Sequence, residues 1–290
     1  MYSQQPALAA RNVREIVDPI EMRRTILTQS RRANVGHIGS CLSVVEILAA
    51  LYGQVLRIAT PEDPGRDRLI LSKGHAALAL YTALLSRGWI SPSELDTFCG
   101  DGTVLGVHPE AAVRGIDFST GSLGHGLSIG VGSALAARIQ GSSRRVFCLI
   151  SDAELNEGAV WEAAMFAAHH RLGNLTAVLD WNGQQAFGLT RDVLEVSNPG
   201  ERWSAFGWRT TEVDGHAVPQ LAAALDAPAP AGAPPHIVLA RTVFGKGVSF
   251  MEQGVPLSRA HLAVHTINWH YLPMSDDEYR MAMVELEKSG

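Results

Sequence analysis

Short apolar runs alternate with helical segments along most of this chain, and this alternation constrains the fold more than any other feature. The runs at residues 68–72, 145–150, 175–180 and 236–241 read as strands that are apolar on both faces. Segments with helical spacing of apolar residues separate most of them. The sequence therefore predicts an α/β fold, a parallel sheet with helices on both faces.

The helical segments and the remaining loops complete this outline. Helices are expected at residues 13–33, 44–56, 76–86, 123–139, 158–171 and 275–288. Ser275 is expected to cap the last helix, because acidic residues fill its first turn. The Pro/Ala-rich stretch 227–235 is expected to be a surface loop, since a strand resumes directly after it. We expect residues 1–290 to form a single domain, with residues 1–12 as a flexible tail.

Composition and charge exclude several classes of protein. With 46% hydrophobic and 18% charged residues, the chain is globular rather than disordered. A net charge of −5 without a polybasic run argues against nucleic-acid and membrane partners. No apolar stretch approaches the roughly 20 residues that span a bilayer, and the N-terminus lacks the pattern of a signal peptide. Scattered cysteines without CxxC spacing indicate a reducing compartment, so we expect a cytoplasmic protein.

Polar residues follow two successive strands of the predicted sheet. Asp152 comes just after the strand at 145–150, and Asn182 just after the strand at 175–180, with a helix between them. Because parallel strands end at the same edge of a sheet, both side chains are expected at the edge where ligands bind. Carboxylate and amide oxygens suit Mg²⁺, whose about six positions leave room for phosphate oxygens. Taken one at a time, both residues also fit ordinary turn chemistry.

The stretch from Ser151 to Asn182 resembles the cofactor motif of thiamine diphosphate enzymes, and within them the transketolases. That motif is Gly-Asp-Gly followed further along by Asn. Other stretches match transketolases in the same order, namely GHIG at 36–39, SKGHA at 72–76, HPE at 108–110, GSLGHG at 121–126 and GKGVSFME at 245–252. The segments 154–158 and 161–168 resemble the N-terminal subunit of split transketolases. The resemblance extends over roughly residues 20–285.

The resemblance implies a diphosphate-binding domain with a magnesium site. Asp152 and Asn182 would bind Mg²⁺ through their side chains, and Gln184 through its carbonyl. The residues implied to contact the cofactor are His75, Gly121, Leu123, Gly124, Asp152, Ala153, Glu154, Asn182 and His270.

The resemblance also implies catalytic residues. His37, His75 and His108 would line the cleft above the thiazolium ring, and Glu162 would belong to a carboxylate relay between two active sites. Neutral imidazole with a pKa near 6.5 suits proton transfer at a sugar hydroxyl, which typically contributes about 10² to 10⁴ in rate. A lone histidine is more often structural, and the spacing of His261 and His265 without an HExxH motif does not indicate zinc.

Several positions depart from the family pattern. Ser151 and Ala153 stand where glycines are usual, and Val107 stands where Gly usually precedes His108. The C-terminal histidine of the family best matches His270, which is expected to face the diphosphate. It is followed by Tyr271 and preceded by an insert at 256–268 that contains His261 and His265.

In this family, as the resemblance implies, a different domain holds the aminopyrimidine ring and supplies the activating Glu. Too few residues follow Phe250 for such a domain, so a separate C-terminal transketolase subunit is the expected partner, in a heterotetramer. The expected activity is transfer of two-carbon ketol units between sugars or sugar-like substrates, with thiamine diphosphate and Mg²⁺. The alternatives are the α subunit of a 2-oxo acid dehydrogenase and a catalytically silent ligand-binding partner.

Overall fold

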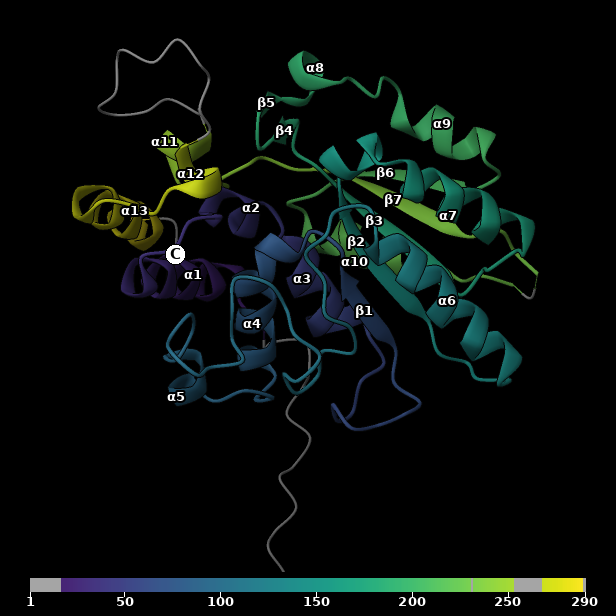
Figure 1. The fold of residues 1–290 in the computed structure, drawn as a ribbon, viewed down its shortest axis with the longest axis horizontal. Helices are drawn as coiled ribbons and strands as arrows, with labels where there is room; N and C mark the ends of the chain where they lie inside the picture. The colour runs from purple at the N-terminus through teal and green to yellow at the C-terminus, as the bar shows by residue number, and fades with distance from the viewer. Residues whose placement is uncertain (1–16, 231, 253–267, 289–290) are drawn as a thin grey trace, which may run out of the picture.

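A five-stranded parallel sheet forms the centre of the molecule. The computed structural model describes residues 17–230, 232–252 and 268–288. Within them the strands run in the spatial order β1-β2-β3-β7-β6 (Figure 1). Their bounds are β1 Arg68–Leu71, β2 Val146–Ser151, β3 Leu175–Trp181, β6 Arg209–Asp214 and β7 His236–Arg241. A short antiparallel hairpin of β4 (Gln184–Gln185) and β5 (Gly188–Leu189) follows β3.

The helices connect these strands and cover the sheet. The α-helices are α1 Pro19–Ala33, α2 Ile38–Ser43, α3 Val45–Ala50, α4 Ala77–Ser86, α5 Pro92–Leu95, α6 Gly126–Ile139, α7 Gly158–His169, α8 Thr190–Val193, α9 Pro199–Ala205, α10 Val218–Leu225, α11 Ser249–Glu252, α12 Asn268–Tyr271 and α13 Asp276–Lys288. A short π-helix, η2 (Leu51–Val55), follows α3. Two short 3₁₀-helices are η3 (Gly74–Ala76) and η4 (Ala153–Asn156).

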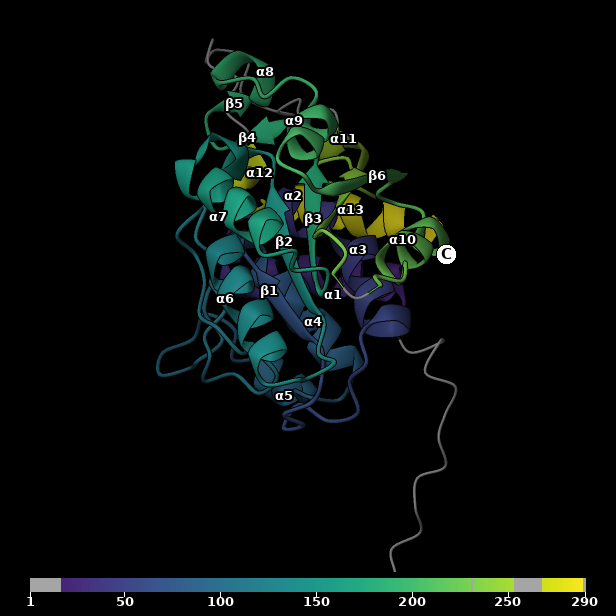
Figure 2. The same ribbon diagram turned by 90° about the vertical axis from the view of Figure 1, so that its right-hand side faces the viewer.

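The two faces of the sheet carry separate hydrophobic cores. Figure 2 shows the helices α6 and α7 on one side of the sheet and α3, α10 and α13 on the other. Successive residues of β2 point alternately into them. Phe147 and Leu149 belong to the core under α1–α4, whereas Cys148 and Ile150 belong to the core under α6 and α7. All four side chains are fully buried. The prediction of a parallel sheet covered on both faces is therefore confirmed.

The bounds of some helices differ from the predicted ones for local reasons. The helix expected at 123–139 begins at Gly126, because the loop before it needs a positive φ of 83° at Gly124. The helix expected at 44–56 changes into the short π-helix η2 at Leu51. Ser275 does cap α13, since its hydroxyl accepts the Glu278 N–H and the Glu278 carboxylate accepts the Ser275 N–H.

The edge strand β6, beside β7, was not predicted from the sequence. Its residues, RTTEVD, alternate between half-buried and exposed side chains, so it lacks the apolar run that identified the central strands. The β-branched residues Thr210, Thr211 and Val213 were the available signal. The connection from α10 to β7 contains the Pro/Ala stretch and has no regular structure at 227–230 and 232–235.

Three expectations concern features that the described residues do not decide. The tail at 1–12 is outside the described residues, and the single domain and cytoplasmic location stay predictions. Among the described residues, every helix is too short or too polar to cross a membrane.

A buried histidine at the start of β7 predicts acid sensitivity. Burial, reinforced by the Arg209 charge, lowers the pKa of His236 from 6.5 to about 4. The unfolded chain therefore binds a proton below about pH 6.5 that the folded chain does not bind until about pH 4. Stability from this residue is lost as the pH falls through that window, by roughly 2 to 3 kcal/mol. We expect His236→Gln, which can keep the contact to Thr211, to remove this part of the pH dependence.

Urea unfolding of both proteins between pH 7.5 and 4.5 measures the effect. An identical pH dependence of the unfolding free energy in the variant and the parent chain would show that His236 is not the group responsible.

Candidate functional site

A cavity of about 630 Å³ lies beyond the carboxyl ends of β1, β2 and β3. We call it the histidine cleft. It brings together most of the residues predicted for the site, namely His37, His75, His108, Gly121, Leu123, Ala153, Asn182, Gln184 and His270. The other predicted cofactor and metal residues, Gly124, Asp152 and Glu154, are buried directly behind its wall.

Asp152 follows the last residue of β2 and is only 2% exposed. Its Oδ2 accepts hydrogen bonds from the Gly183 N–H at 2.7 Å and from the Thr190 hydroxyl at 3.2 Å. Burial and the neighbouring Asp180 raise the pKa of Asp152 to about 7. In this setting, a nearby cation would strongly stabilise the charged form of the carboxylate.

Asn182 lies one residue beyond β3, on the same turn that binds Asp152. Its Nδ2 donates to the carboxylate of Asp180 at 3.0 Å, and its Oδ1 accepts the Gln184 N–H at 2.9 Å. The side-chain Oε1 of Gln184 is buried and has no hydrogen-bond partner in the described part of the chain. Since Ser151 pairs with Asp180 in the sheet, the ends of β2 and β3 place Asp152 and Asn182 on one edge, as the sequence predicts.

A buried ion pair under the cleft joins two residues that were not among the predicted site residues. The Lys73 ammonium, just beyond β1, donates to Asp180, the next-to-last residue of β3. Both side chains are at most 1% exposed. Ser43 and Thr242 also donate to the Asp180 carboxylate. The sequence places Lys73 after one predicted strand and Asp180 at the end of another. Only the structure shows that the two side chains form an ion pair.

Glu154 ties together the loops behind the cleft. Its carboxylate accepts hydrogen bonds from the Gly124 N–H at 2.9 Å, from the Ser151 N–H at 2.8 Å and from the Ser72 hydroxyl. The side chain is fully buried, and burial raises its pKa. Through these contacts Glu154 connects the ends of β1 and β2 to the loop before α6. It holds these segments together behind the cleft and does not line the cleft wall.

Three histidine rings form a compact group in the cleft. The ring centroids of His37, His75 and His270 lie 5.3 to 5.5 Å apart. Burial is the main cause that lowers the pKa of His37 to about 4 and of His270 to about 3, and it also lowers the pKa of His75. All three imidazoles are therefore neutral at neutral pH.

The short helix α12 brings His270 into this group. The His270 carbonyl accepts the His37 N–H at 2.9 Å, and a Cβ on Gly36 would lie 2.3 Å from the carbonyl oxygen of Tyr271. The loop before α2 and the segment at 268–271 are thus in direct contact. His261 and His265 lie outside the described residues.

Glycines shape the wall beside His108. Gly121 has a φ of 155°, and a Cβ there would lie 2.9 Å from the His108 ring. A Cβ on Gly74 would lie 2.8 Å from the backbone of Gly121. At Gly74 and Gly121 the loops therefore approach neighbouring groups more closely than a residue with a Cβ atom would allow.

The two departures from the cofactor motif fit the backbone without strain. Neither Ser151 nor Ala153 has a positive φ. Ser151 belongs to β2 and donates its hydroxyl to Glu154, while Ala153 opens the turn η4 and lines the cleft.

Glu162 does not reach the cleft. It is exposed on α7, near Met165 and Phe166, which are 52% and 43% exposed. Its predicted role in a relay between two active sites concerns an assembly and stays a prediction.

Comparison with known proteins identifies the family. Residues 16–275 match the family described as "Transketolase, thiamine diphosphate binding domain". The chain is 38% identical to the 6-deoxy-6-sulfo-D-fructose transketolase subunit SqwG of Clostridium sp. (strain MSTE9), over 93% of this chain and 94% of the relative. It is 35% identical to an apulose-4-phosphate transketolase subunit of Phocaeicola vulgatus, over 92% and 95% of the two chains.

A solved structure gives the same result for the fold. The transketolase of Pichia stipitis in complex with fructose 6-phosphate superposes with a TM-score of 0.80 at 28% identity. The match covers 96% of this chain but only 41% of that longer chain. The resemblance noted in the sequence is thereby confirmed, and the chain belongs to the transketolase family, in which it corresponds to the thiamine diphosphate-binding domain.

Proposed function

We propose that this chain is the diphosphate- and metal-binding subunit of a two-component transketolase that uses thiamine diphosphate and Mg²⁺. The observation that carries the proposal is the match to relatives that are themselves named transketolase subunits. The chain covers nearly all of relatives that are themselves named transketolase subunits, but well under half of the transketolase from Pichia stipitis. This pattern favours a split transketolase over the α subunit of a 2-oxo acid dehydrogenase and over a silent binding protein.

The residues at the ends of β2 and β3 fit a magnesium ion. Asp152 and Asn182 offer hard oxygens, since the Gly183 N–H donates to Asp152 and the Gln184 N–H donates to Asn182 in one turn. The Gln184 carbonyl would be a third oxygen ligand. The described residues contain no group of three or more His, Cys, Asp or Glu that could hold a metal ion, so the proposed ligand set also needs amide, carbonyl and phosphate oxygens. The raised pKa of Asp152 supports this proposal, because a cation would stabilise the charged carboxylate. The Oε1 of Gln184, which has no hydrogen-bond partner among the described residues, supports it as well.

The glycine-shaped wall fits the diphosphate and the thiazolium. Gly121 and Leu123 line the cleft beside His108, and Gly124 holds the loop to Glu154. Thiamine diphosphate, when bound, supplies the carbon nucleophile that this chain's own side chains lack. The chain's role is to bind and orient the diphosphate half and to exclude water from the cleft.

The histidines are suited to bind the hydroxyl groups of a substrate. Because His37, His75 and His270 are neutral, each ring nitrogen that carries no proton can accept a hydrogen bond from a sugar hydroxyl. Their lowered pKa values make them weaker bases than the imidazole with a pKa near 6.5 that was expected from the sequence. The Nδ1 atom of His37 is buried and has no hydrogen-bond partner among the residues that the structure describes, so it is available to a ligand that enters the cleft. His108 completes the set on the side of Gly121.

A separate subunit would supply the aminopyrimidine-binding half and its activating Glu. We infer a heterotetramer of two such chains and two partners. The exposed apolar side chains Met165 and Phe166 on α7, next to Glu162, provide one surface for assembly.

The preferred substrate is a sugar or sugar-like compound. The two subunit relatives are named for different substrates, so family membership does not fix the sugar. Tyr271 stands where the family has Gly, is 58% exposed, and packs against the rings of His37 and His270 at the cleft. This side chain narrows the cleft mouth and is the best candidate for adapting the enzyme to a specialised substrate.

Removing the charge of Asp152 tests the metal site. We expect Asp152→Asn to weaken Mg²⁺-dependent binding of thiamine diphosphate by on the order of a hundredfold, because a direct ligand matters at least as much as outer-shell partners. The amide keeps the size of the side chain and an acceptor for Gly183. Calorimetric titration of the cofactor, with and without Mg²⁺, measures the change. Asp101→Asn, in an exposed turn, is the matched control, and equal affinities for the two variants would remove Asp152 from the site.

Separating the chain from its partner tests the split enzyme. We expect the purified chain to show no ketol transfer alone and to gain activity on addition of a subunit with the pyrimidine-binding half, because the activating Glu lies on that subunit. Formation of the new ketose is followed with a panel of donor and acceptor sugars. Robust turnover by the lone chain would contradict the proposal, and turnover of 2-oxo acids but not ketoses would favour the dehydrogenase alternative.

A further inference from the structure

A second pocket lies at the opposite edge of the sheet, at the amino ends of β2, β3 and β6. Its volume is about 560 Å³. We call it the arginine pocket, because it is lined by the side chains of Arg57, Arg138, Arg144, Arg145, Arg171 and Arg209. Arg138 lies at the end of α6, Arg209 begins β6, and the other four arginines lie in loops that the fold brings to one end of the sheet.

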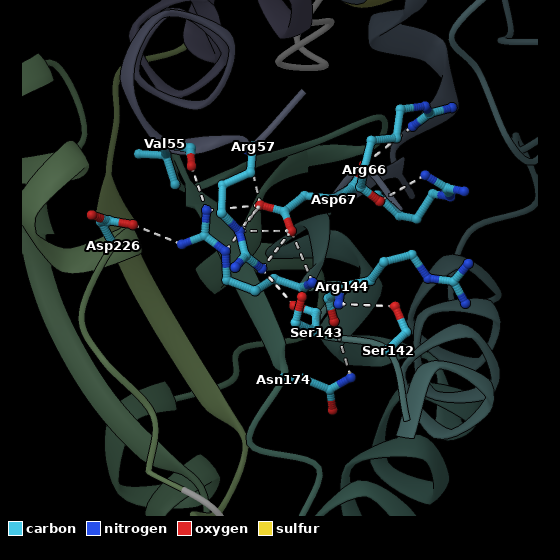
Figure 3. A network of polar contacts seen from close by, with 11 residues as sticks. Val55, Arg57, Arg66, Asp67, Ser142, Ser143, Arg144, Asn174 and Asp226 are labelled. Carbon is cyan, nitrogen blue, oxygen red and sulfur yellow. Dashed lines mark hydrogen bonds and ion pairs between the residues drawn. The ribbon is translucent and has the colours of Figure 1, made fainter. Parts of the chain in front are cut away.

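Two of the arginines are neutralised within the protein. Figure 3 shows Arg57 beside Asp67, whose carboxylate is fully buried. Arg145 pairs with the same carboxylate at 2.7 Å. Arg145 also pairs with Asp226 at 2.7 Å. The two acidic groups of the pocket are thus already engaged, and Asp67 holds two guanidinium groups in place.

The other four arginines have no carboxylate partner among the described residues. Arg138 and Arg171 donate to the carbonyls of His170 and Gly232, and Arg144 donates to the Pro64 carbonyl at 3.0 Å. The guanidinium of Arg209 forms no hydrogen bond or ion pair in the described part of the chain, and its Nε is a buried donor without a partner.

This concentration of charge is unusual for the chain. Six arginines and two aspartates leave a local excess of four positive charges, although the whole chain carries −5. Like charges in one cavity repel one another, so their proximity is unfavourable unless an anion is bound. A guanidinium group also matches phosphate in geometry, because it can donate two parallel hydrogen bonds to the phosphate oxygens.

We propose that the arginine pocket binds a small multivalent anion of the phosphate or phosphate-ester class. The site is distinct from the histidine cleft, because the six residues of β2 separate the two edges by about 20 Å. The proposal goes beyond the transketolase reaction and does not depend on it, since it rests on the charges and contacts of this pocket alone.

Calorimetric titration of the full-length chain with inorganic pyrophosphate, in EDTA and at low salt, tests the proposal. We expect saturable binding that weakens with added NaCl. Arg209→Gln is expected to weaken it about tenfold, as the loss of one charge-assisted contact does. Because Arg209 has no side-chain partner to lose, this variant is expected to unfold at the same urea concentration as the parent chain.

Two further variants sharpen the experiment. Arg144→Gln removes a second unpaired charge on another wall of the pocket and is expected to weaken pyrophosphate binding to a similar degree. Arg280→Gln, on the exposed side of α13 far along the chain, is the matched control and is expected to bind as the parent does. No binding at all, or equal affinities for Arg209→Gln and Arg280→Gln, would overturn the proposal.

Discussion

The buried ion pair between Lys73 and Asp180 is the interaction on which the geometry of the histidine cleft depends. Asp180 lies at the end of β3, and its carboxylate accepts hydrogen bonds from Ser43 on α2, from Lys73 after β1 and from Thr242 after β7. One fully buried group therefore fixes the carboxyl ends of three strands and the first helix over the cleft. Loss of one partner from such a pair typically destabilises a protein by about 3 to 5 kcal/mol, because the other charge stays buried.

The same carboxylate orients the amide that we assign to the metal. Asn182 donates its Nδ2 to Asp180, so its Oδ1 must point the other way, toward the turn at Gly183 that also binds Asp152. Glu154 has the equivalent function on the other side, where it holds the loop at Gly124 against β2. Burial raises the pKa of both Asp152 and Glu154. The fold thus collects acidic groups whose charged forms are stabilised by hydrogen bonds and, at Asp152, would be stabilised by the cation that we propose.

The central strands could be identified from the sequence because burial on both faces leaves a continuous apolar run. The strand β6 could not, since an edge strand that faces solvent needs few apolar residues. Among the site residues, those next to strand ends or glycines could be placed from the sequence, as Asn182 and His75 show. The contacts of Asp180 with Lys73, and of Glu154 with the loop at Gly124, join residues far apart in sequence. Such contacts depend on the register between strands, which no local pattern in one sequence reveals.

The strands also explain why charge separates along the sheet. β2 begins directly after Arg144 and Arg145 and ends before Asp152, so its two ends carry opposite charges. The edge strand β6 has the same order, because it begins at Arg209 and ends at Asp214. Parallel strands bring their like ends to one edge of the sheet, so the charges at the ends of β2 and β6 add rather than cancel. Carboxylates therefore gather where a metal is expected, and guanidinium groups gather where an anion is expected. The strand β2 between the two edges is fully buried and keeps both sets in place, so binding of the ligand proposed for each edge requires no rearrangement of the core.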